Sequence, residues 1–119
     1  MKNKQISNSD AVSFSLMQTI HDEPNITQRE LADKLGLSLG KVNYCIKALV
    51  DKGLIKIDNF RASEAKWRYM YVLTPKGFAA KASLTRQFLE CKLREFEDLQ
   101  AQIIMLQAEV KTTQDSTLT

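Results

Sequence analysis

The sequence predicts a mainly helical fold that contains one small β-hairpin and ends in a long helix. Three observations lead to this prediction. Apolar residues recur at helical spacing in three short segments, and hydroxyl side chains that can cap a helix precede them. A segment rich in aromatic and β-branched residues follows, as expected of paired strands. Beyond Pro75 no further proline occurs, so the last segment can form an uninterrupted helix.

The length and composition are those of one ordinary globular domain. The chain has 119 residues, of which 44% are hydrophobic and 26% charged. No segment approaches the roughly 18 apolar residues of a membrane helix, and the polar first residues lead into no signal-type apolar run. We therefore expect a cytoplasmic protein without a membrane partner.

The first helix is expected to begin after Ser7 or Ser9 and to end near His21, because Pro24 cannot continue it. The apolar residues that mark its buried face are Val12, Leu16, Met17 and Ile20.

The second helix is expected to begin with a capping box between Thr27 and Glu30, and Gly36 lies where a left-handed residue ends a helix. Ser38 can cap the third helix, which is expected over residues 39–52 and ends at Gly53. The predicted buried residues of the second helix are Leu31, Ala32 and Leu35, and those of the third are Leu39, Val42, Ile46, Leu49 and Val50.

Residues 54–58 and 67–73 are predicted to form the two strands of the hairpin, with the largely polar residues 59–66 as its loop. Thr74 and Pro75 are typical of a helix start, so the last helix is expected from Pro75 to about Val110. The predicted organisation is a flexible N-terminus (1–8), a body (9–77), a long C-terminal helix (78–110) and a flexible tail (111–119).

Only residues 36–38 separate the second and third helices, which predicts a helix-turn-helix. In such a pair the first helix rests on the DNA backbone, and the N-terminal part of the second enters the major groove. Lysine can bind guanine or phosphate, asparagine can read adenine, and Gly40 permits close approach. A solvated surface also carries such residues, so the pair alone leaves both interpretations open. The candidate DNA-binding residues are Thr27, Gln28, Ser38, Gly40, Lys41, Asn43, Tyr44 and Lys47.

A hairpin directly after the third helix is typical of the wing of a winged helix, which can place basic side chains on DNA. The candidates here are Arg61, Lys66 and Arg68. Residues 27–76 hold 10 basic and 5 acidic side chains, against 2 and 3 in residues 1–26 and 5 and 6 in residues 77–119. This basic centre favours nucleic-acid binding. An ordinary surface hairpin is the alternative, and Glu64 lowers the positive charge.

A heptad pattern in the last helix predicts a homodimer interface. Its apolar residues are Leu89, Phe96, Leu99, Ile103, Leu106 and Val110, whereas Lys92 occupies a position where an apolar residue is expected. The stripe spans roughly 30 Å, more than a small body covers. The alternative is a helix folded back on its own domain. A two-fold dimer would prefer a roughly palindromic DNA site.

Three segments resemble the winged helix-turn-helix regulators of the MarR type: residues 27–38 (TQRELADKLGLS), 48–56 (ALVDKGLIK) and 73–77 (LTPKG). Residues 38–45 (SLGKVNYC) resemble a subgroup associated with bacterial exopolysaccharide gene clusters. The resemblance covers about residues 10–110. It implies a dimeric, double-stranded-DNA-binding transcriptional regulator that controls exopolysaccharide biosynthesis genes. The chain is shorter than the larger members, so their dimer geometry and effector pocket are not carried over.

Catalysis is not expected, because no Ser/His/Asp set, carboxylate pair or phosphate-binding loop stands out. One histidine and two distant cysteines, Cys45 and Cys91, are too few for a zinc site, and no cofactor is implied. Two other functions remain open: a winged-helix protein–protein interaction module without DNA binding, and a coiled-coil assembly factor. The exposed face of the third helix distinguishes them, since a protein-docking face should carry less charge.

Overall fold

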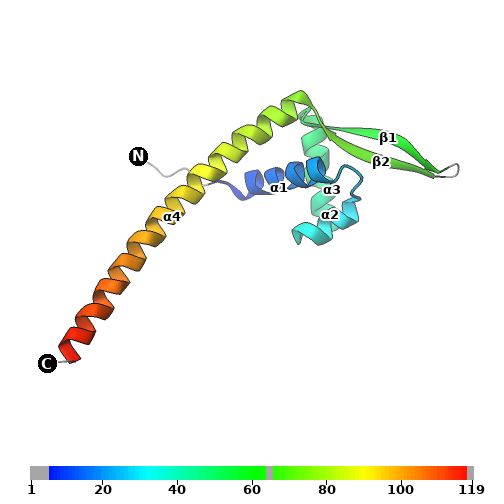
Figure 1. Ribbon diagram of the computed structural model, residues 1–119. Coiled ribbons are helices and arrows are strands. Elements are labelled where there is room, and N and C mark those ends of the chain that lie inside the picture. The colour runs from blue at the N-terminus through cyan, green and yellow to red at the C-terminus, as the bar shows by residue number, and fades with distance from the viewer. Residues whose placement is uncertain (1–5, 64–65, 118–119) are drawn as a thin grey trace.

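Three helices, one β-hairpin and a long last helix follow one another in the order that the sequence predicts (Figure 1). This computed structural model describes residues 6–63 and 66–117, without the side chains of residues 59–69 and 117. Within that part of the chain lie four helices and two antiparallel strands, which confirms the mainly helical fold with a small hairpin. The elements are α1 (Asn8–Asp22), α2 (Gln28–Leu35), α3 (Leu39–Asp51), β1 (Ile55–Ser63), β2 (Lys66–Leu73) and α4 (Pro75–Thr117).

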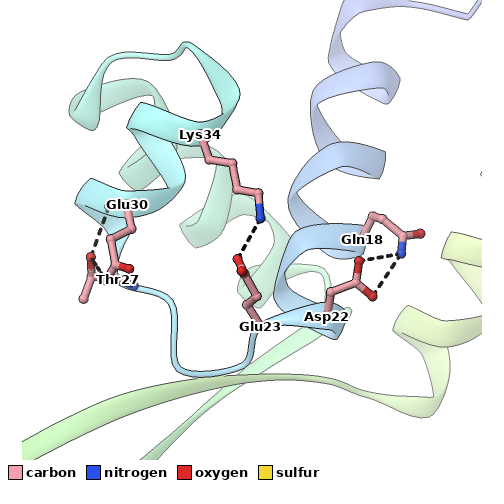
Figure 2. A network of polar contacts seen from close by, with 6 residues as sticks. All are labelled: Gln18, Asp22, Glu23, Thr27, Glu30 and Lys34. Carbon is pink, nitrogen blue, oxygen red and sulfur yellow. Dashed lines mark hydrogen bonds and ion pairs between the residues drawn. The ribbon is translucent and has the colours of Figure 1, made fainter.

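The first three helices begin at predicted caps, and α2 also ends at its predicted cap, Gly36. The Ser7 and Ser38 hydroxyls each accept a backbone N–H at 3.1 Å, and Thr27 forms the complete capping box with Glu30 (Figure 2). Gly36 ends α2 with φ 67°, a left-handed conformation that glycine adopts without strain. Because Ser7 is the cap, α1 already begins at Asn8, inside the segment expected to be flexible.

The core lies where α1, α2 and α3 meet the base of the hairpin. Its largest fully buried side chains are Leu16, Met17, Ile20, Leu31, Val42, Ile46 and Ile55. One predicted core residue is misplaced: Leu39 is 45% exposed. It lies in the first turn of α3, and the buried residues of that helix begin only at Val42.

The hairpin is longer than predicted, and residues 59–63 and 66 are strand, not loop. The strands pair from Ile55 opposite Leu73 out to Ser63 opposite Lys66, with an irregularity between Arg61 and Ser63. Only the base of the hairpin belongs to the core, through Ile55, Tyr71 and Leu73. Backbone hydrogen bonds hold the outer part, and these do not require apolar side chains.

Helix α4 begins at the predicted cap, where the Thr74 hydroxyl accepts the Gly77 N–H at 3.0 Å. Its first turns pack on α1, with the rings of Phe14 and Phe88 4.7 Å apart. The helix then leaves the body on the side opposite the hairpin and gives the molecule extents of 82 × 32 × 21 Å (Figure 1).

The end of α4 differs from the prediction, because the helix continues to Thr117 rather than stopping near Val110. The hydroxyls of Thr112 and Thr113 donate to the carbonyls of Ala108 and Glu109 at 2.9 and 3.0 Å, so these polar residues fit the helix. No helix in the described part of the chain combines the length and apolarity that crossing a membrane requires.

Candidate nucleic-acid interface

Helix α3 presents two opposite faces. Val42, Ile46 and Leu49 are at most 2% exposed and hold the helix against the core. The opposite face is exposed along the whole helix, and its centre consists of Gly40, Asn43, Tyr44 and Lys47, which follow one another at intervals of three and four residues. The structure therefore places six of the sequence-predicted residues on one surface: Ser38, Gly40, Lys41, Asn43, Tyr44 and Lys47.

The N-terminal end of this surface is open to a large partner. A Cβ atom built on Gly40 would meet no atom within 4 Å, so the backbone there is uncovered. The Ser38 oxygen accepts the Lys41 N–H as the helix cap, and its hydroxyl also carries a proton that it can donate. Tyr44 is 72% exposed one turn later.

The charge on this surface is positive. Among the described residues the ion pairs lie elsewhere, at Lys34–Glu23, Lys56–Asp58 and Lys92–Glu95. Lys41 and Lys47 therefore keep their charges for an anionic partner. Lys34, by contrast, points back across the turn between α1 and α2, where its Nζ lies 2.9 Å from Glu23 Oε2 (Figure 2).

Two predicted site residues at the start of α2 form hydrogen bonds within the protein: Thr27, the exposed N-cap, and Gln28, which is half-buried. The Thr27 hydroxyl donates to Glu30 Oε1 at 2.9 Å and accepts the Glu30 N–H. The Gln28 Nε2 donates to the Tyr71 hydroxyl at 3.2 Å, and the Tyr71 N–H donates to the Pro24 carbonyl. Gln28 therefore joins α2 to the base of the hairpin and fixes the hairpin beside the helix-turn-helix. Sequence reasoning missed this role, because it depends on a contact with Tyr71, 43 positions along the chain.

The three predicted basic residues of the hairpin lie in its outer part. In the pairing of the strands, Arg61 is opposite Trp67, Arg68 opposite Phe60 and Lys66 opposite Ser63. Their side chains are outside the described part of the structure, so their contact with DNA stays a prediction.

The part of α4 beyond Phe88, residues 89–117, is its projecting half. The predicted dimer residues all lie there, and all are exposed. The exposed fractions range from 45% for Ile103 to 60% for Leu106. Every residue from 95 to 116 is exposed, so the alternative in which this helix folds back on its own body is wrong for that segment. The remaining exposed large apolar residues beyond Leu89 are Leu93, Ile104 and Met105.

Comparison with known proteins shows the same fold. Residues 2–56 match a family model described as winged helix-turn-helix DNA-binding. No curated protein matches the sequence. Among solved structures, the transcriptional regulator BldR from Sulfolobus solfataricus is similar over 74% of this chain and 61% of its own, with 17% identity and a TM-score of 0.64.

Two structures with bound DNA are also similar. A mutant of MepR from S. aureus bound to an oligodeoxyribonucleotide covers 88% of this chain and 80% of its own, with 19% identity and a TM-score of 0.60. A mutant of MarR from E. coli complexed with operator DNA is similar over 65% of this chain and 54% of its own, with 23% identity and a TM-score of 0.54. These likenesses establish a winged helix-turn-helix body followed by a long helix, in a chain that spans about three fifths (61%) of BldR.

Proposed function

We propose that this protein is a sequence-specific regulator of transcription that binds duplex DNA as a homodimer. The observation that carries the proposal is the exposed polar and positive face of α3, whose opposite face is fixed in the core. The match of residues 2–56 to a winged helix-turn-helix DNA-binding model supports it.

In this proposal the N-terminal part of α3 enters the major groove. Asn43 has the paired donor and acceptor that recognise adenine, and Lys41 and Lys47 bind guanine acceptors or phosphates. The hydroxyl proton of Ser38 and the N-terminal end of α3 suit a phosphate oxygen. The hairpin, with Arg61, Lys66 and Arg68, lies along the flanking backbone as a wing.

The homodimer is supported by the exposed apolar stripe on α4. An isolated helix does not keep such a stripe in water, because burying each large apolar side chain is worth about 1.5–3 kcal/mol. Pairing through Phe96, Ile103 and their heptad neighbours makes binding of the second half-site intramolecular and strengthens the whole complex. The operator is then roughly palindromic, with half-sites separated by whole turns of about 10 bp.

The regulated genes are proposed to be those of exopolysaccharide biosynthesis, and the protein to act in the cytoplasm. What supports the first point is the resemblance of residues 38–45 to the exopolysaccharide-associated subgroup.

The competing function is a protein–protein interaction module that does not bind DNA. Its docking face would be less charged at its centre than the face formed by Asn43, Lys47 and neighbouring Lys41. The structure therefore favours the DNA-binding function.

Fluorescence anisotropy tests the proposal with DNA from upstream of the protein's own gene and a scrambled duplex, each at two salt concentrations. We expect tighter binding to the native DNA and weaker binding as salt rises, because phosphate contacts release counterions. Equal, salt-sensitive binding to both duplexes would support DNA binding and place the operator elsewhere. Absence of binding to either would favour the interaction module.

A further inference from the structure

Leu39 is an exposed apolar residue at the part of α3 nearest to the expected base pairs. Nearly half of its surface, 45%, is open, although the helical period places it in line with the core residues Val42, Ile46 and Leu49. A single exposed leucine is ordinary elsewhere on a protein. Here it lies next to Gly40, where the backbone itself is uncovered.

Leu39 and Asn43 are neighbours on the surface of α3. They lie four residues apart, which places their Cβ atoms about 5–6 Å from each other on one side of a helix. Successive base pairs are stacked about 3.4 Å apart. A helix docked by this end therefore brings the two side chains to the same base pair or to adjacent ones.

We propose that Leu39 reads the C5-methyl group of thymine, and that each half-site of the operator contains an A·T pair at the position of Leu39 and Asn43. This inference rests on the proposed function and deepens it. The thymine methyl group is the apolar feature of the major groove, and adenine is the base that an asparagine amide recognises in a bidentate manner. One A·T pair, or two adjacent pairs, satisfies both side chains.

The test removes the methyl group without changing any hydrogen-bonding group. A binding duplex is first selected from a random library with the wild-type protein, and each thymine of the half-site is then replaced by uracil. We expect one or two replacements to weaken wild-type binding about four-fold each, the worth of one buried methyl-sized group. Leu39→Ala should bind the thymine and uracil duplexes equally, whereas Leu39→Met should keep the discrimination.

The control is Met105→Ala, which truncates an exposed apolar residue far from α3 and should discriminate uracil as the wild type does. Equal wild-type affinity for all uracil duplexes would overturn the inference, as would unchanged discrimination by Leu39→Ala. If no duplex is selected at all, it is the proposed DNA-binding function that fails.

A second inference concerns the orientation of the paired α4 helices, and a different observation carries it. In the heptads, Ile103 and Val110 occupy the last two a positions, after Leu89 and Phe96, and Leu99 and Leu106 occupy d positions. Among parallel coiled coils, β-branched residues at a with leucine at d favour two strands over three or four.

The orientation itself follows from the charges that flank the apolar positions, and these favour parallel helices. Glu95 and Glu109 occupy g positions, and Gln100, Gln107 and Gln114 occupy e positions. Parallel helices bring each g residue to the e position of the partner helix, which places glutamate beside neutral glutamine. The antiparallel register that stacks Leu99 on Ile103 instead brings Glu95 opposite Glu109, where like charges repel.

We propose that a second copy of this chain binds the projecting half of α4 in parallel, so that both bodies lie at the same end of the paired helices. The a and d residues of the paired helices form the seam of the dimer. Lys92 occupies a d position, but its Nζ lies 3.2 Å from Oε2 of Glu95, a g residue, so its charge lies at the edge of the seam. The inference rests on the proposed homodimer.

Disulfide trapping in a chain whose Cys45 and Cys91 are replaced by serine distinguishes the two orientations. The Val110→Cys variant should form a disulfide-linked dimer with oxidised glutathione, since position 110 faces itself only in parallel helices. The double variant Lys92→Cys with Val110→Cys reports the opposite arrangement, because these positions face each other in antiparallel helices. Linkage only in the double variant would overturn the parallel orientation, and monomers in sedimentation would reject the dimer itself.

Discussion

Helix α3 and the projecting half of α4 are both amphipathic, yet they use their apolar faces in opposite ways. The stripe of α3 is covered by α1, α2 and the hairpin, so that helix offers polar and charged groups to solvent. The stripe of α4 beyond Phe88 is uncovered, so that helix offers apolar groups. The contrast matches the two partners proposed above, an anionic one for α3 and a second apolar helix for α4.

The strongest test of this contrast is to place charges in the seam of α4. Phe96→Asp with Ile103→Asp should produce monomers, because carboxylates cannot be buried in an apolar interface. DNA affinity should fall about 10²–10⁴-fold with the loss of the second half-site. Sedimentation velocity measures the first effect and anisotropy the second. Ile104→Asp with Met105→Asp is the matched control on the other sides of the same helix, and an intact dimer is expected there. An equal effect of the two pairs would show that the heptad assignment is wrong.

Removing polar groups from the exposed face of α3 should weaken DNA binding and leave the dimer intact. Lys41→Ala with Asn43→Ala should lower affinity for the specific duplex at least about ten-fold, since each base contact is worth about 1–3 kcal/mol. Lys111→Ala removes the same charge from the distal part of α4 and should leave affinity unchanged. Unaltered binding by the α3 variant in anisotropy would disprove the groove assignment.

The joint between the two regions is sensitive to a single methyl group. Gly77 is buried in the first turn of α4, and a Cβ atom there would overlap the carbonyl group of Leu54. Gly77→Ala should lower the free energy of unfolding by about 1–3 kcal/mol, because the packed backbone has to move. Urea denaturation measures the change, and an unshifted midpoint would contradict the close contact.

Gly40 should show the reverse behaviour. An added Cβ meets nothing within 4 Å, so Gly40→Ala should keep or raise stability by up to about 1 kcal/mol through helix propensity. The same methyl group should weaken DNA binding, because it separates the backbone of α3 from the groove. Urea denaturation tests the expected stability and fluorescence anisotropy the expected DNA affinity, both on one preparation. Undiminished affinity would argue against a close approach of the α3 backbone to the groove at this position.

The helical parts of the fold are predictable from sequence because local groups determine them. Ser7, Thr27, Gly36, Ser38 and Thr74 cap or end helices through bonds to residues three or four positions away, and the structure confirms these caps. The exposed face of α3 follows from the same periodicity. The outer strands do not, since residues 59–63 are held by backbone pairing with a distant segment rather than by an apolar pattern.

The misplaced details have physical causes of the same kind. Periodicity assigns Leu39 to the core, but it cannot show that the core ends before the first turn of α3. Composition assigns residues 111–117 to a tail, although Thr112 and Thr113 can bond back to their own helix. The tie between Gln28 and Tyr71 spans 43 positions and has no local signal.

The start of α4 has a consequence for the operator. The Thr74 hydroxyl donates to the Gly53 carbonyl at 2.5 Å, the Thr74 N–H donates to the Leu54 carbonyl at 3.0 Å, and Lys76 Nζ donates to the Lys52 carbonyl at 3.1 Å. These bonds lock the direction of α4 to the end of α3. In a dimer joined through α4, the distance between the two α3 helices then depends on this corner, where residues 74–76 are hydrogen-bonded to residues 52–54. If the proposed dimer forms, the spacer between its half-sites depends on this corner, whose residues lie outside the proposed DNA-reading face of α3.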